Sequence, residues 1–268
     1  MPPLEIDGAK IAYEEVGTGP PVLLIHGTGG AVWDPLPAQL AAAGHRAISY
    51  HRRGFGASRC PPIKDPPRHT RDAAALLERL DAAPAIVVGH SMGGVLTLDL
   101  AIRRPDLVRG LVVIEPPLHL KKHPTMKMMR ELIGAQILRR RRGDEAAAER
   151  FMRWATTTTD GMNGYDTTPP EVQAELRANA SAIMRELDSG TGEQVASAEL
   201  GSISCPAILL LGSMTLPDYE KAAQRIKKAL PPLEIVTVPG AGHLLPVTHP
   251  ASVLDAVRRV SRDPALAS

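Results

Sequence analysis

The sequence has few aromatic residues, few cysteines and no long apolar run. Phenylalanine, tryptophan and tyrosine make up only 3% of its 268 residues, so a surface that stacks nucleic-acid bases is not expected. The two cysteines, Cys60 and Cys205, are far apart and lack the spacing of metal ligands. They predict reduced thiols and no metal site.

The sequence also has no large excess of positive or negative charge. Lysine and arginine number 31 against 29 aspartates and glutamates, a formal net charge of +2, which gives no reason to expect nucleic acid or an acidic membrane as a partner. No segment is apolar for long enough to cross a bilayer, and the first residues lack the basic and apolar blocks of a signal peptide. Together these absences predict a cytoplasmic, globular protein.

What the chain does contain is an alternation of short apolar runs and amphipathic segments. Short apolar runs suit strands buried on both faces, and apolar residues at helical spacing indicate helices. Strands alternating with helices predict an α/β fold with a doubly wound, mostly parallel sheet. The expected strands are residues 4–6, 10–16, 21–26, 45–50, 85–88, 107–115, 207–212 and 233–238, and the main expected helices are 34–43, 68–83, 217–230 and 246–261.

Residues 118–203, called here the helical section, break this alternation because they hold helical patterns and no convincing strand. The section contains six of the nine methionines, and flexible thioethers suit an adaptable apolar pocket. We therefore expect a helical insertion over the carboxyl edge of the sheet.

A Gly-x-Ser-x-Gly turn lies between an expected strand and an expected helix, in residues 85–94 (AIVVGHSMGG). In a turn of this kind the serine occupies a tight, strained apex, and its hydroxyl is held clear of the sheet edge. Glycines two residues on either side allow strand and helix to approach closely. The pattern predicts Ser91 as a nucleophile.

A serine hydroxyl needs a neighbouring base to take its proton. The glycine-rich loop 239–243 (PGAGH) follows the last expected strand and can return His243 over the sheet edge. Acyl transfer also needs donors for the oxygen that becomes negative in the transition state. The backbone N–H groups of Met92 and Thr28 are the candidates.

These motifs, with the loop 53–58 (RGFGAS), make the chain resemble the α/β-hydrolase superfamily over nearly all of its length. The resemblance implies an eight-stranded, mostly parallel sheet with a cap inserted after the sixth strand, and no cofactor. The core would then comprise residues 1–117 and 204–268, and the cap residues 118–203.

Two positions depart from the family pattern. His51 stands where an Asp is usual in the loop before Arg53, and Thr215 stands where the acid of the triad usually follows the seventh strand. Glu115, at the end of the strand next to the one bearing Ser91, is the preferred acid, an arrangement similar to that of zearalenone-type lactonases. Asp218 and a Ser–His pair without an acid remain alternatives.

The sequence thus predicts a serine esterase or lactonase that cleaves a hydrophobic small molecule through an acyl-enzyme. A carbon–carbon bond hydrolase, a cofactor-free perhydrolase and a non-catalytic ligand receptor are the alternatives. The residues expected to line the substrate pocket are Gly27, His90, Met126, Met129, Trp154 and Leu244.

Overall fold

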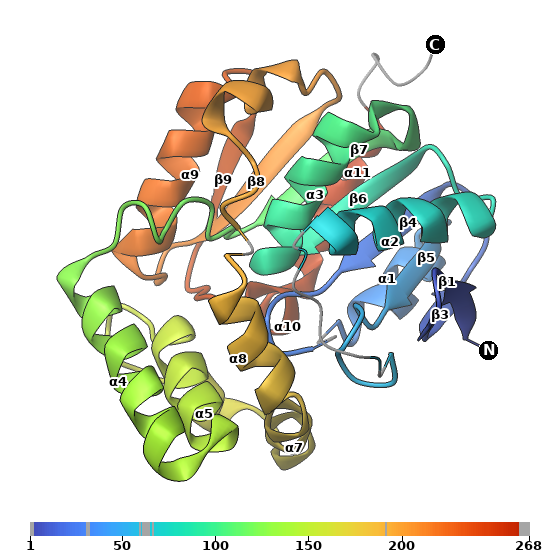
Figure 1. The fold of residues 1–268 in the computed structure, drawn as a ribbon. Coiled ribbons are helices and arrows are strands. Elements are labelled where there is room, and N and C mark those ends of the chain that lie inside the picture. The colour runs from blue at the N-terminus through green and yellow to red at the C-terminus, as the bar shows by residue number, and fades with distance from the viewer. Residues whose placement is uncertain are drawn as a thin grey trace.

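A seven-stranded sheet forms the centre of the computed structural model, which describes residues 3–30, 33–58, 60, 65, 67–190 and 192–262 (Figure 1). The strand order is β3-β5-β4-β6-β7-β8-β9; β3 pairs antiparallel with β5, and the other five pairings are parallel. The strands are β3 (Tyr13–Val16), β4 (Pro21–Ile25), β5 (Arg46–Tyr50), β6 (Ala85–His90), β7 (Val108–Ile114), β8 (Ala207–Gly212) and β9 (Glu234–Val238).

The expectation of eight strands in one sheet is wrong for the described part of the chain. The run expected as one strand over residues 10–16 is divided at Ala12 into β2 (Ala9–Ile11) and β3. The Ala12 N–H donates to Ser58 Oγ over 2.8 Å instead of to a neighbouring strand. β2 therefore pairs with β1 (Leu4–Ile6) in a separate two-stranded sheet, while β3 joins the main sheet.

Helices cover both faces of the main sheet, as the expected doubly wound fold requires. Successive side chains of a strand point to opposite faces, and β4 shows this clearly. Leu23 and Ile25 pack with α2 (Pro67–Arg79), α3 (Met92–Arg103) and α9 (Pro217–Ala229). Val22 and Leu24 pack on the other face with α1 (Leu36–Ala42) and α11 (Pro250–Ser261).

The helical section supplies five helices between β7 and β8, which lie together at one end of the molecule (Figure 1). Asn179 ties them to the core: its side-chain amide donates to the Gly29 carbonyl over 2.8 Å, and its oxygen accepts from Gly56 N over 2.9 Å. Gly29 and Gly56 follow β4 and β5, so these helices lie over the carboxyl ends of the strands. The helices are α4 (Met126–Arg142), α5 (Asp144–Ala155), α6 (Gly164–Thr167), α7 (Pro170–Ala178) and α8 (Ala180–Asp188).

Three short elements complete the described chain: the 3-10 turns η1 (Pro105–Leu107) and η2 (Ser197–Ser202), and α10 (Leu245–Thr248) before α11. Within the described ranges, none of the helices is both long and apolar enough to span a membrane.

Candidate active site

Ser91 sits at the turn between β6 and α3 with φ 53° and ψ −120°, the left-handed region that L-residues rarely adopt. The turn is possible because its glycines leave room for the neighbouring chain. A Cβ on Gly93 would lie 1.9 Å from the Ile25 carbonyl oxygen, and one on Gly89 would lie 2.2 Å from Thr97 Oγ1. The strained turn expected from the sequence is therefore present, with Ser91 at its apex.

His243 lies in the loop after β9, and its ring connects Ser91 to Glu115. His243 Nε2 is 3.0 Å from Ser91 Oγ, and His243 Nδ1 is 2.7 Å from Glu115 Oε2. Because a carboxylate only accepts, the Nδ1–H donates to Glu115, and in the neutral ring Nε2 is left to accept the serine proton. Tyr219 was not predicted from the sequence as part of this site. Its ring stacks on His243 with centroids 4.1 Å apart and planes 15° from parallel.

Glu115 is fully buried directly after β7, with φ 44°. Its Oε1 accepts from the Gly212 N–H over 2.7 Å, and its Oε2 accepts from Thr215 Oγ1 over 2.8 Å. Thr215, which stands where the family usually has its acid, thus helps to orient a carboxylate from the adjacent strand. Hydrogen bonds of this kind, with the imidazole, compensate the burial of a charge.

Asp218, the alternative acid, has a different partner. Its Oδ1 accepts from Thr125 Oγ1 over 2.9 Å, so it joins α9 to the start of α4. The geometry therefore brings Glu115, and not Asp218, to His243.

His90 lies beside the nucleophile, and its Nε2–H donates to the His243 carbonyl over 2.7 Å. Burial lowers the pKa of His90 to about 3, so its ring stays neutral at ordinary pH. It acts here as a fixed donor that holds the His243 loop.

The expected oxyanion donors flank Ser91. A Cβ on Gly27 would lie 2.9 Å from Ser91 Cβ, which shows how closely the loop bearing Thr28 approaches the serine. Neither the Thr28 N–H nor the Met92 N–H donates to another described residue. Within the described part of the chain, both N–H groups therefore have no acceptor and can donate to the oxygen of a ligand.

A buried ion pair behind this loop was not foreseen. Arg52 Nη1 lies 2.5 Å and Nη2 3.1 Å from the Glu186 carboxylate, and Arg52 Nη2 also donates to the Gly27 carbonyl over 3.0 Å. Thr28 Oγ1 donates to Glu186 Oε2 over 2.6 Å. Desolvation is the largest single influence on the Glu186 carboxyl and raises its pKa, but the charge and hydrogen bonds of Arg52, together with His69 and Thr28, outweigh it, so the pKa is lowered. The network joins Glu186 of α8 to Arg52, 134 residues earlier, and to Thr28 of the oxyanion loop, 158 residues earlier, separations that no local pattern reveals.

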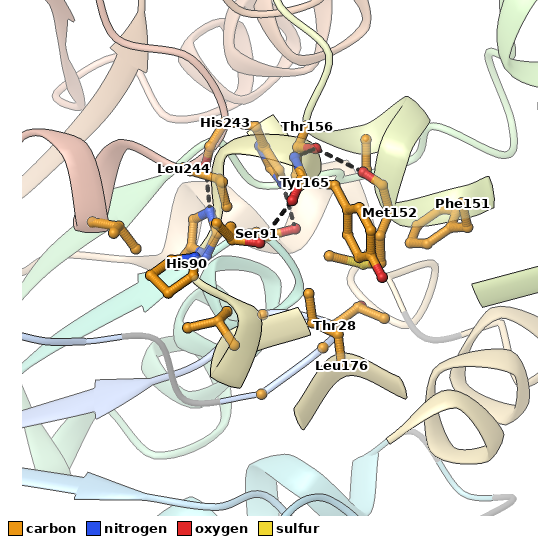
Figure 2. Close-up of a pocket in the computed structure, with 18 residues that line it drawn as sticks. Thr28, His90, Ser91, Phe151, Met152, Thr156, Tyr165, Leu176, His243 and Leu244 are labelled. Carbon is orange, nitrogen blue, oxygen red and sulfur yellow. Dashed lines mark hydrogen bonds between the residues drawn. The ribbon is translucent and has the colours of Figure 1, made fainter. Parts of the chain in front are cut away.

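Two cavities of about 60 Å³ each reach Ser91 and Thr28. The first, called here the apolar cavity, is shown in Figure 2, and the described residues that line it include no lysine, arginine, aspartate or glutamate. Gly27, His90 and Leu244 line it as expected. Its apolar wall comes largely from the helical section, through Phe151, Met152, Tyr165, Val172 and Leu176.

The second is called here the lysine cavity, after Lys121 in its lining, and Trp154 lines this one. Met126 and Met129 line neither cavity, contrary to expectation. They lie 79% and 39% exposed on the outer face of α4, while Met128, which is 4% exposed, faces inward and lines the lysine cavity. Successive residues of an α-helix are rotated by about 100° around its axis. When Met128 faces the core, Met126 and Met129 therefore point in other directions.

A metal site is not apparent, because no group of three or more His, Cys, Asp or Glu side chains within the described ranges is arranged to hold an ion.

Comparison with known proteins agrees with this architecture. The model of the Alpha/beta hydrolase family matches residues 22–256. The chain belongs to that family.

Two individual relatives resemble the chain over different lengths. The chain is 29% identical over 252 residues to a "Putative non-heme chloroperoxidase" of Synechocystis, covering 89% of this chain and 90% of the relative. It is 44% identical over 109 residues to the "Putative non-heme bromoperoxidase BpoC" of Mycobacterium tuberculosis, but that match spans only 39% of this chain and 41% of the relative.

Among solved structures, the enol-lactonase of Burkholderia xenovorans superposes with a TM-score of 0.79. It is 19% identical, and the match covers 98% of this chain and all of the enol-lactonase. At that identity the likeness shows the fold alone. The family and these similarities support a hydrolase.

Proposed function

We propose that this protein is a serine hydrolase that cleaves a carboxylic ester or lactone of a hydrophobic small molecule through an acyl-enzyme. The observation that carries the proposal is the hydrogen-bonded series from Ser91 through His243 to Glu115, with separations of 3.0 Å and 2.7 Å. In this proposal residues 118–203 form a cap over a core made of residues 1–117 and 204–268.

In the first half of the reaction, Ser91 Oγ attacks the ester carbonyl carbon as His243 Nε2 takes its proton. Glu115 keeps the Nδ1–H in place and stabilises the imidazolium that forms. The Met92 and Thr28 N–H groups donate to the carbonyl oxygen as it becomes negative. The tetrahedral intermediate then expels the alkoxide, which receives the proton from His243.

In the second half, water attacks the acyl-enzyme with His243 again acting as base, and Ser91 is released. With a lactone, the leaving hydroxyl stays attached to the acyl group, so one hydroxy acid is the only product. The mechanism requires no cofactor.

The substrate's hydrophobic character follows from the apolar cavity. Among the described residues, its lining holds no Lys, Arg, Asp or Glu side chain, and transfer of an apolar group into such a site is favourable at about 25 cal/mol per Å². The hydrogen-bonded Ser91, His243 and Glu115 support attack on an ester or lactone carbonyl.

A second candidate is perhydrolysis, in which hydrogen peroxide replaces water in the attack on the acyl-enzyme and yields a peracid. The names of the Synechocystis and M. tuberculosis relatives, both non-heme haloperoxidases, favour it. It uses the same three side chains, because the acyl-enzyme forms in the same way.

The test is hydrolysis of a panel of p-nitrophenyl esters and aromatic lactones, with peracid formation measured in added peroxide. Ser91→Ala should lower hydrolysis by about 10⁴-fold or more, and a fluorophosphonate should label the wild type but not the variant. Tight ligand binding without labelling would instead support a receptor. Turnover of β-diketones but of no ester would favour a carbon–carbon bond hydrolase.

A further inference from the structure

Ser91 lies where the apolar cavity and the lysine cavity meet. Both cavities are lined by Ser91, Thr28 and Phe151. A substrate whose scissile carbonyl is at Ser91 can therefore extend into both, with a different part of the molecule in each. The two linings differ in charge, because only the lysine cavity contains ionised side chains of lysine and glutamate.

Two of the three charged groups in the lysine cavity lie next to a cation. The Glu186 carboxylate is paired with the buried Arg52 guanidinium. Glu193 Oε2 lies 3.4 Å from Lys122 Nζ. Lys121 is the charged group of this lining without a salt bridge in the described chain, and the carboxylates of Glu193, Asp188 and Glu186 act on it from a greater distance.

The Lys121 ammonium forms no ion pair with a carboxylate anywhere in the described chain. It donates one hydrogen bond to the Leu187 carbonyl and has three N–H groups in all. Burial lowers the pKa of this ammonium, and the nearby carboxylates oppose the shift only in part. Lys121 lines the cavity although the residue as a whole is exposed to solvent. A cation in this setting gains from a ligand that supplies a negative charge.

Trp154 lines the lysine cavity and also a separate pocket between α4 and α5. The residue is 5% exposed, and its indole N–H is buried without a hydrogen-bond partner among the described residues. A ligand that brings an oxygen acceptor within reach of this N–H would satisfy it.

We propose that the lysine cavity binds a carboxylate of the substrate, with Lys121 as its counter-ion. The inference rests on the proposed function and narrows it. The substrate is an anionic ester or lactone, with an apolar group on one side of the scissile carbonyl and a carboxylate on the other. Neutral esters of equal size bind without this interaction.

The test compares carboxylates with primary amides of the same shape. Monobutyl glutarate against butyl glutaramate places the charge on the acyl side. 4-(Butanoyloxy)butanoate against its amide places the charge on the alcohol side. Each pair is assayed for kcat and KM by the release of acid.

In one of the two pairs, kcat/KM should favour the carboxylate by about tenfold or more, the size expected of a hydrogen bond to a charged group. Lys121→Met should abolish that preference, mainly through KM, and leave the amide unchanged. Lys228→Met, an exposed lysine on α9, is the matched control and should retain the preference. Higher salt should weaken the preference because Lys121 is partly exposed.

The outcomes separate the two proposals. If the wild type hydrolyses the amides and carboxylates equally and Ser91→Ala abolishes both, the serine hydrolase stands and the carboxylate site is wrong. If no compound is hydrolysed and no fluorophosphonate label forms, the proposed function fails. The carboxylate site is then decided by calorimetric binding of the four compounds: equal affinity for carboxylate and amide, or no effect of Lys121→Met, would overturn it.

Discussion

The loops that hold Ser91, Glu115 and His243 and the helices that cover them position their side chains by different means. In the loops, strained backbone at strand ends fixes the geometry: Ser91 has φ 53° and Glu115 has φ 44°. In the helical section, the choice of which helix face docks decides the lining, as Met126 and Met128 show with exposures of 79% and 4%. The loops can be recognised in the sequence because tight turns require glycine. The face by which a helix packs against the core has a weaker sequence pattern.

The largest effect is expected in the loops. Glu115→Gln should lower kcat about 10³- to 10⁴-fold, because a neutral amide neither stabilises the imidazolium nor holds the Nδ1–H in one orientation. Asp218→Asn is the matched control and should change kcat little, since its partner is Thr125. Steady-state hydrolysis of the best ester would measure both. A large loss of kcat in Asp218→Asn, with kcat retained in Glu115→Gln, would contradict the assignment of Glu115 as the acid.

The next effect concerns the Arg52–Glu186 ion pair, which joins the loop after β5 to α8. Arg52→Met leaves the Glu186 carboxylate buried without its cation, which is expected to cost about 3–5 kcal/mol of unfolding free energy in urea. Replacing both residues by methionine should cost less than the sum of the single changes. Strict additivity of Arg52→Met and Glu186→Met would show that the two side chains do not interact.

Acid should destabilise the core through its buried histidines. Burial lowers the pKa of His69 and of His90 to about 3 each, and that of His26 well below its usual value. Below a pH of about 6.5 the unfolded chain takes up protons that the folded chain does not, so stability is present above that pH and is lost as the pH falls.

Each such histidine contributes a loss of about 1.4 kcal/mol per pH unit between pH 6 and 4. His69→Gln should therefore reduce the slope of unfolding free energy against pH by about that amount, as measured by urea titrations at several pH values. An unchanged slope would mean that His69 is protonated in the folded protein.

The last prediction concerns the two faces of α4. Met128→Ala removes a buried side chain and should cost about 2–5 kcal/mol, whereas Met126→Ala on the exposed face should stay within about 0.5 kcal/mol. The difference between these two variants, measured by urea unfolding, tests which face of α4 docks. Equal losses would contradict the arrangement.

The sequence predicted the fold class well, because buried strands and glycine turns have short-range signatures. The strand before Ser91 was expected at residues 85–88 and is β6, Ala85–His90. The strand count was wrong, since the division at Ala12 depends on a hydrogen bond to Ser58, 46 residues away. The placement of Glu115 beside His243 agrees with the interpretation from adjacent strands, although its catalytic role stays a prediction.

The sequence by itself determined the doubly wound sheet and the turn at Ser91, because apolar periodicity and the steric demands of glycine act over a few residues. Only the tertiary structure decided which carboxylate meets His243, how Arg52 and Glu186 pair, and which methionine faces a cavity. Those outcomes depend on contacts between segments far apart in the chain. Their energies come from burial and charge pairing, which exist only after the segments have packed.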